Sequence, residues 1–94
     1  MSRAFIINVN GSTQELNHKP TLKEAQEIVG GYIEFVSGKL DNGRNVTLVM
    51  DDAGQLKGKA VNLKATVAYQ TKYPSTRDII VGDVIVLEGW RTVG

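Results

Sequence analysis

The clearest pattern of apolar and polar positions lies in residues 21–37, where a helical spacing gives way to the alternation of a strand. Over residues 22–29, apolar side chains recur at intervals of three and four, which predicts a helix with one apolar stripe. After a double glycine, aromatic and β-branched residues alternate with other side chains over residues 32–37, a pattern typical of a β-strand. Because both faces of this strand carry apolar groups, we place it centrally in a sheet.

The two ends of this helix have local signals of their own. Thr21 and Glu24 stand in the S/T-x-x-E relation, in which each side chain accepts a hydrogen bond from the other residue's backbone N–H. They therefore predict the N-terminus of the helix. Gly30 predicts its C-terminus, because glycine takes up the positive φ of a helix cap without a steric penalty.

The first part of the chain predicts a hairpin. Residues 4–9 form a short apolar run, and the Asn10-Gly11 pair that follows is preferred in tight turns between antiparallel strands. Residues 13–16 are then the returning strand. We place that strand at an edge of the sheet because its side chains are polar.

A second hairpin and a last strand follow from two further turn sequences. The Asp-Asn-Gly sequence at 41–43 predicts that residues 46–50 fold back antiparallel onto residues 32–36. Nearer the C-terminus, the Gly-Asp pair at 82–83 interrupts an apolar run. A buried strand over residues 84–87 is expected after that interruption.

Residues 60–72 fit two different structures. The alternation over residues 63–70 fits a strand, whereas an apolar stripe from Val61 to Lys72, with Asn62 as the N-terminal cap, fits a helix. Periodicity alone leaves both structures open.

Length and composition predict one small soluble domain. A chain of 94 residues holds one modest core, and the absence of cysteine excludes a disulfide framework and thiolate metal sites. No apolar run approaches the roughly 18 residues that span a bilayer, and the first residues lack the features of a signal peptide. We therefore expect a single domain over residues 1–94 in the cytoplasm, without membrane association and with frayed ends at residues 1–2 and 91–94.

The charge balance argues against nucleic acid as the partner. Eleven Lys and Arg residues face ten Asp and Glu residues, for a net charge of +1. A DNA mimic would be strongly acidic, and a protein held by nonspecific phosphate contacts would be clearly basic. Lysines in the middle of the chain still leave a local basic patch open.

No motif in the sequence indicates a catalytic or cofactor site. Asp51 and Asp52 are expected to accept backbone hydrogen bonds in a turn. His18, the only histidine, is expected in a loop without a nearby carboxylate or cysteine. A catalytic alternative combines His18 with Glu34, Asp51, Asp52 or Asp83, but nothing in the sequence indicates that these groups converge. We therefore expect no enzymatic activity, no cofactor and no metal site.

Four stretches of the sequence together carry a family resemblance. They are VGGYIE at 29–34, GQLKG at 54–58, Asn62 with Ala65, Thr66 and Tyr69, and IVGDV at 80–84. This combination, which extends over about residues 6–87, resembles a family of small domains of unknown function found largely in bacteriophages, prophages and gut metagenomes. The resemblance implies that residues 60–72 are helical. It also implies a viral or mobile-element origin and a bacterial cytoplasm, and it implies no mechanism.

These elements together predict an α+β fold. We expect a small, mostly antiparallel sheet of about four to five strands with two helices on one face. The other face and an edge of the sheet would then be free for association, and homo-oligomers are common for domains of this size.

The function we favour is that of a noncatalytic phage accessory protein, which binds and sequesters a host protein or a small molecule in a host-takeover or anti-defence role. Aromatic side chains dominate interface hot spots, so the candidate binding residues are aromatic anchors and polar residues of the same segments. They are Tyr32, Glu34, Asn62, Thr66, Tyr69, Tyr73 and Trp90. For Tyr32 and Tyr69, packing in the core is an equal alternative.

The alternative function is that of a nucleic-acid-binding α+β domain. In that case aromatic side chains on a sheet face stack on bases and basic residues meet phosphates. The basic candidates are Lys57, Lys59, Arg77 and Arg91.

Overall fold

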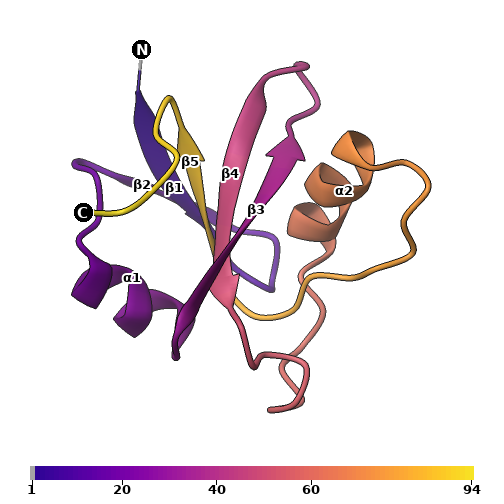
Figure 1. Cartoon of the computed structure of the whole chain (residues 1–94), viewed down its shortest axis with the longest axis horizontal. Coiled ribbons are helices and arrows are strands. Elements are labelled where there is room, and N and C mark those ends of the chain that lie inside the picture. Colours follow the sequence, from indigo (N-terminus) through magenta and orange to yellow (C-terminus); the bar gives the residue numbers. More distant parts are fainter. Residues whose placement is uncertain (1) are drawn as a thin grey trace.

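A five-stranded antiparallel sheet lies between two helices in the computed structural model, which describes residues 2–94 (Figure 1). The strands follow the order β2-β1-β5-β4-β3 across the sheet. The elements are β1 Arg3–Ile7, β2 Thr13–Leu16, α1 Leu22–Val29, β3 Ile33–Lys39, β4 Asn45–Asp51, α2 Leu63–Lys72 and β5 Val84–Glu88. The predicted α+β class, with an antiparallel sheet and two helices, is confirmed.

The two helices cover opposite faces of the sheet, and the central strand β5 explains why. Val84 and Val86 pack in the core on the α2 side, whereas Ile85 and Leu87 pack in the core on the α1 side. Successive side chains of a strand point to opposite faces, so a strand that is buried throughout needs a covering layer on each face. The expectation that both helices lie on one face and leave the other open is therefore wrong.

Strand β3 lies at an edge of the sheet, so the central position predicted for residues 32–37 is also wrong. Its apolar residues serve two cores, because Val36 packs on the α2 side and Ile33 on the α1 side. Phe35 nevertheless remains 40% exposed. Apolar groups on both faces of a strand therefore indicate that both faces of the sheet are covered. They do not distinguish a central strand from an edge strand.

Both predicted hairpins are present. β1 pairs antiparallel with β2, and β3 pairs antiparallel with β4. The turns contain Gly11 and Gly43, whose φ angles are 89° and 86° and thus lie in the region that glycine adopts most readily. The polar strand β2 lies at the other edge of the sheet, as predicted.

The predicted ends of α1 are confirmed atom by atom. Oγ1 of Thr21 accepts from the Glu24 N–H at 3.1 Å, and Oε1 of Glu24 accepts from the Thr21 N–H at 2.9 Å. Gly30 ends the helix with a φ of 80°.

The helix expected within residues 60–72 is present as α2, with Asn62 as its cap. The strand expected over residues 84–87 is present as β5.

The C-terminal segment runs along the α1 side of the sheet. Trp90 and Val93 pack against the core on that side, and the Gly94 N–H donates to the carbonyl oxygen of Pro20 at 3.0 Å. The fraying expected at residues 1–2 and 91–94 stays a prediction, and residue 1 lies outside the described residues. Within residues 2–94, neither helix has the length and hydropathy needed to cross a bilayer.

Candidate binding site beside strand β3

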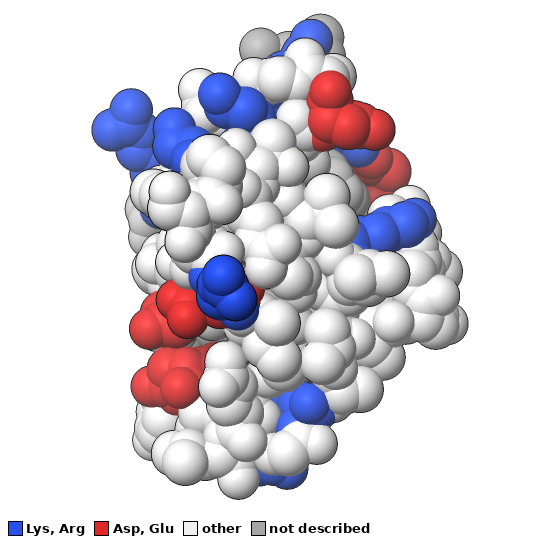
Figure 2. All heavy atoms as spheres, turned by 90° about the vertical axis from the view of Figure 1, so that its right-hand side faces the viewer, with Lys and Arg blue, Asp and Glu red and all other residues white. Residues whose placement is uncertain are grey.

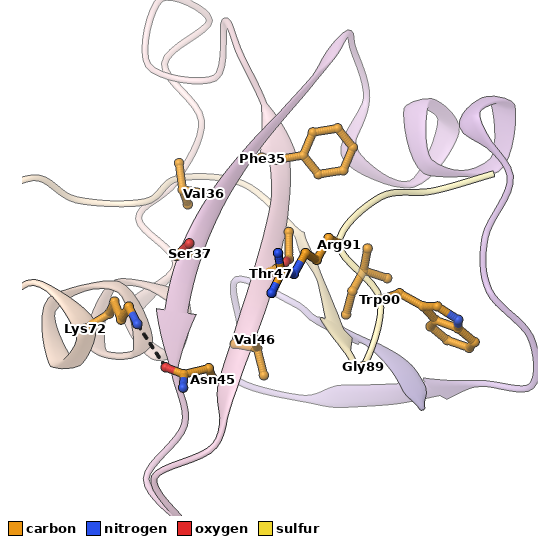
Figure 3. A pocket seen from close by; sticks show the side chains of 11 residues that line it. Phe35, Val36, Ser37, Asn45, Val46, Thr47, Lys72, Gly89, Trp90 and Arg91 are labelled. Atoms are coloured by element: carbon orange, nitrogen blue, oxygen red, sulfur yellow. Dashed lines mark hydrogen bonds between the residues drawn. The ribbon is translucent and has the colours of Figure 1, made fainter. Parts of the chain in front are cut away.

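A hollow of about 750 Å³ lies at the β3 edge of the sheet (Figure 3). Part of its lining is one row of the sheet register, in which Ser37 pairs with Thr47 and Thr47 pairs with Leu87. Leu87 packs on the α1 side, so this row faces that side. We call the whole feature the β3 hollow. It is lined by Phe35, Val36, Ser37, Asn45, Val46, Thr47, Lys72, Leu87, Gly89, Trp90 and Arg91.

The hollow exists because α1 is too short to cover the whole α1 side of the sheet. A helix of eight residues spans about 12 Å. Its buried residues share a core with Val49 and Ile85, which form the neighbouring row of the register. Thr47 lies two residues further along β4, about 7 Å away, and is only partly buried. The sheet is therefore left partly open at its β3–β4 hairpin end.

Two aromatic side chains from separate segments line the hollow. Phe35 comes from β3, and Trp90 comes from the C-terminal segment beyond β5 (Figure 3). Phe35 is 40% exposed, and Trp90 is half-buried against the α1-side core. Partly exposed aromatic rings beside hydroxyl groups, here those of Ser37 and Thr47, offer a binding partner both apolar area and hydrogen bonds.

The charged groups that line the hollow are all cationic. Lys72 from α2 and Arg91 from the C-terminal segment belong to the lining, and none of its residues is Asp or Glu. Nζ of Lys72 donates to Oδ1 of Asn45 at 3.0 Å, which fixes the cation at the rim (Figure 3). Electrostatics therefore favour a ligand that carries negative charge.

Strand β3 also presents unpaired backbone groups beside the hollow. The carbonyl oxygen of Tyr32 accepts from Asp52 at 3.0 Å, and the N–H of Leu40 donates to Arg44 at 2.9 Å. In an antiparallel pair, the backbone groups of successive residues point alternately toward and away from the partner strand. The N–H and C=O groups of residues 34, 36 and 38 therefore point toward β4. Ile33, Phe35, Ser37 and Lys39 direct their N–H and C=O groups outward, and no hydrogen bond joins these groups to any other part of residues 2–94.

Two of the predicted binding residues lie outside this hollow, although they flank or belong to β3. Tyr32 is 76% exposed and lines a smaller depression together with Gln26, Asp52 and Lys57. Glu34 is exposed on β3, where it pairs with Met50, a residue of the α2-side core. The structure therefore does not bring either residue to the β3 hollow.

Two other predicted binding residues are structural. Nδ2 of Asn62 donates to the carbonyl oxygens of Ile7 and Gly82, both at 2.9 Å, while Oδ1 accepts from the N–H of Ala65 at 3.1 Å. Oγ1 of Thr66 accepts from the Ile80 N–H at 2.9 Å. Both side chains are buried, so their polar atoms are already used inside the protein.

The remaining aromatic candidates divide between two places. The rings of Tyr69 and Tyr73 lie 5.2 Å apart at the C-terminal end of α2, where Tyr69 packs on the core and Tyr73 is 43% exposed. Trp90 alone of the predicted binding set lines the β3 hollow. Sequence reasoning missed Phe35, Thr47 and Lys72, although an aromatic residue in a strand next to polar Ser37 is a signal that could have found Phe35.

The basic residues of the nucleic-acid alternative are not gathered on one surface patch. Lys57 and Lys59 both bind the buried carboxylate of Asp51, at 2.8 and 2.7 Å. Arg77 is exposed in the loop after α2, and Arg91 lines the β3 hollow. Figure 2, which views the protein from the α2 side, shows a mostly uncharged surface on which basic side chains lie at several separate places, one of them near the middle and beside acidic groups.

The titratable groups of the catalytic alternative have separate partners. His18 lies next to a carboxylate after all, because its Nε2 is 3.1 Å from Oε1 of Glu24, so the expectation of an isolated histidine is wrong. Glu24 lies in the first turn of α1, six residues after His18. A backbone hydrogen bond from Thr21 and the contact with His18 lower the pKa of Glu24. This pair is exposed.

The other carboxylates serve backbone groups and lysines. Oδ1 of Asp51 accepts from the Ala53 N–H at 2.9 Å, as expected of a turn aspartate, and Oδ1 of Asp83 accepts from the Val9 N–H at 3.0 Å. Within residues 2–94, no three His, Cys, Asp or Glu side chains gather in a way that would hold a metal ion.

The fold and the site define a small α+β domain with a five-stranded sheet between two helical layers, in which β2 and β3 are the edge strands. The chain belongs to the family described as Domain of unknown function (DUF3846), whose model matches residues 2–92. The expectation that the chain belongs to a family of unknown function is thereby confirmed. No curated protein and no solved structure matches the chain.

Proposed function

We propose that this protein is a noncatalytic binding protein that captures another protein at the β3 hollow. The observation that carries the proposal is the presence, in one hollow, of Phe35 and Trp90 together with the cations of Lys72 and Arg91. Trp and Arg are among the side chains that supply most of the binding energy in protein interfaces, and Phe is enriched there. The hollow therefore has the chemistry of an interaction surface.

The distribution of acids and bases supports binding rather than catalysis. Acid–base chemistry needs titratable groups within hydrogen-bond reach of one another in a pocket. Asp51 is occupied by two lysines, Asp83 by a backbone N–H, and His18 by the exposed Glu24. The charged residues that line the β3 hollow, Lys72 and Arg91, are both basic, and no Asp, Glu or His lines it beside them.

The biological setting belongs to the same proposal. We place the protein in bacteriophages or other mobile elements, where it sequesters a protein of the bacterial host cytoplasm. The support for this setting is the resemblance carried by the four stretches of the sequence.

A capture experiment tests the proposal. The purified protein is immobilised and incubated with a bacterial lysate, and the retained proteins are identified by mass spectrometry. The Phe35→Glu variant places a charge in the hollow, while Leu56→Glu makes the same exchange at a residue that is 93% exposed elsewhere on the surface. We expect one retained protein on the wild type and on Leu56→Glu, and its loss on Phe35→Glu.

Two results would contradict the proposal. One is a retained set that is the same on all three proteins, and the other is an empty set on the wild type. A metabolite that copurifies with the wild type and is absent from Phe35→Glu would assign the hollow to a small molecule instead of a protein.

A further inference from the structure

We infer that the ligand of the β3 hollow is an extended, acidic segment of a protein, which adds to the sheet as a further strand beside β3. This inference rests on the proposed function and specifies its ligand. It is carried by the free backbone groups of β3 and by the charge of the hollow beside them.

The backbone of β3 has the geometry needed to pair with a further strand. Outward N–H and C=O groups at residues 33, 35, 37 and 39 repeat at the spacing that a paired strand requires. Addition of a peptide strand to such an edge draws its affinity from main-chain hydrogen bonds and its specificity from pockets for alternate side chains. The β3 edge is accessible at its middle, where Phe35 and Ser37 are exposed.

The hollow supplies the pocket for alternate side chains. Phe35 and Ser37 point to the α1 side, so every second side chain of an added strand lies beside them and beside Trp90. The intervening side chains point to the α2 side, toward Lys72. An apolar residue next to Phe35 therefore fits the first set.

The charge of the lining selects an acidic segment over other protein segments. Arg91 lies on the C-terminal segment and Lys72 on α2, and the lining contains no carboxylate to neutralise either cation. Asp or Glu side chains on an added strand would complement them. A basic segment would bring like charges together.

The sequence of β3 disfavours a second copy of the chain as the occupant. The strand that a second copy would add carries one acidic residue, Glu34, and one basic residue, Lys39, so it brings no net negative charge to Lys72 and Arg91. Charge complementarity therefore favours a different protein, with a more acidic segment.

A displayed library of random heptapeptides provides the probe. Selection on the wild-type protein, with the uncharged variant Phe35→Ser as the counter-selection, yields the peptides that need the hollow. We expect enrichment of Asp and Glu together with β-branched or aromatic residues in alternation. Enrichment of basic sequences would overturn the inference, as would peptides without acidic residues. The most enriched peptide is then synthesised with a fluorescent label.

Ser37→Pro tests the main-chain hydrogen bonds. Proline removes the outward N–H at a position where an edge strand tolerates it, and the matched variant Ser37→Ala removes only the hydroxyl. We expect Ser37→Pro to weaken binding of the labelled peptide about tenfold more than Ser37→Ala does, because Ser37→Ala keeps the N–H and loses at most a hydroxyl contact. Amide spectra by NMR establish that each variant is folded.

A modified peptide gives the same test without altering the protein. N-methylation of alternate peptide residues should abolish binding in one register and leave it nearly unchanged in the other, because only alternate N–H groups of a strand face β3. Equal tolerance of both methylated peptides would overturn strand addition. If that peptide still required Phe35, the proposed function would stand and only the mode of binding would fail.

Charge reversal tests the acidic character of the ligand. Lys72→Glu and Arg91→Glu should each weaken the peptide by about tenfold or more and remove most of the salt dependence. Arg77→Glu makes the same change at an exposed residue outside the hollow and should have little effect. Equal effects of all three variants would contradict a local role of the two cations. A shift of the wild type to dimers in solution, with loss of peptide binding, would assign β3 to self-association.

Discussion

Nζ of Lys59 lies 2.7 Å from Oδ2 of Asp51, a carboxylate whose side chain is completely buried. The same Nζ donates to the carbonyl oxygen of Val29 at the end of α1, and Lys57 likewise binds Asp51 and the carbonyl oxygen of Gly30. α1 has no basic residue in its own last turn. Two lysines from the loop after β4 therefore supply the positive charge that stabilises a helix C-terminus, and Asp51 holds both lysines in place.

This cluster should make the protein less stable in acid. Burial raises the pKa of Asp51, but hydrogen bonds from Lys57, Lys59 and the Ala53 N–H outweigh burial and hold the pKa well below its ordinary value of 3.8. A carboxyl group whose pKa is lowered by folding contributes stability above its unfolded pKa and loses it as the pH falls toward the folded value. We expect the contribution of Asp51 to be complete at pH 7 and to decline below about pH 4.

Urea unfolding of the wild type and of Asp51→Asn between pH 7 and pH 2 measures this contribution. The variant should be less stable at pH 7 by about 3 kcal/mol, because the two lysines lose their buried partner. The difference between the two proteins should shrink as the pH falls below about 4. A difference that stays constant over the whole range would contradict the role of the Asp51 charge.

The two lysines of the cluster should contribute unequally. The side chain of Lys59 is 24% exposed, whereas that of Lys57 is 43% exposed and is therefore better screened by water. Lys59→Met should lower the free energy of unfolding by about 1–3 kcal/mol, and Lys57→Met by less than about 1 kcal/mol. Chemical denaturation at neutral pH gives both values, and the reverse order would show that exposure does not decide the effect.

Asn62 should be among the most sensitive positions in the protein. Asn62→Ala removes the cap of α2 and leaves the carbonyl oxygens of Ile7 and Gly82 without their buried donor. We expect a loss of about 3 kcal/mol or more in the free energy of unfolding. Asn62→Asp keeps a capping oxygen but replaces the donor with a carboxylate oxygen that faces the two carbonyl oxygens. Full recovery of stability in that variant would mean that the two carbonyl contacts contribute nothing.

The free edge of β3 predicts an alternating pattern of amide exchange. The N–H groups of residues 34, 36 and 38 are directed toward β4, whereas those of residues 35, 37 and 39 are directed outward. Hydrogen exchange followed by NMR should therefore be slow at the even-numbered residues and fast at the odd-numbered ones. Uniform protection along β3 would indicate that a partner already occupies the edge in solution.

The ends of α1 and the choice of helix for α2 could be predicted because their signals are local. Thr21, Gly30 and Asn62 each act within a few residues, through cap geometry that a short sequence specifies. The position of β3 could not be predicted, because strand order depends on where β5 inserts after the intervening chain has folded. Its two apolar faces suggested a central position in the sheet, whereas β3 is an edge strand.

The candidate site was only partly accessible to sequence reasoning, because three distant segments assemble it. Trp90 was identified as a binding residue and Arg91 as a phosphate contact, and both line the β3 hollow. Phe35 was not identified because its exposure follows from the shortness of α1, and Lys72 was not identified because α2 brings it to Asn45 only in the folded chain. Asn62, in contrast, was predicted to contact a ligand, but its side chain is hydrogen-bonded to the carbonyl oxygens of Ile7 and Gly82.

The last strand of the chain occupies the middle of the sheet. β1 and β4 have no pairing with each other, and each is joined to the sheet only through β5. The two hairpins, β1–β2 and β3–β4, can close early from nearby residues, but they remain separate until residues 84–88 arrive between them. Synthesis of the chain through residue 88 thus precedes the step that joins the two hairpins, and a chain released before that point lacks the strand that unites them.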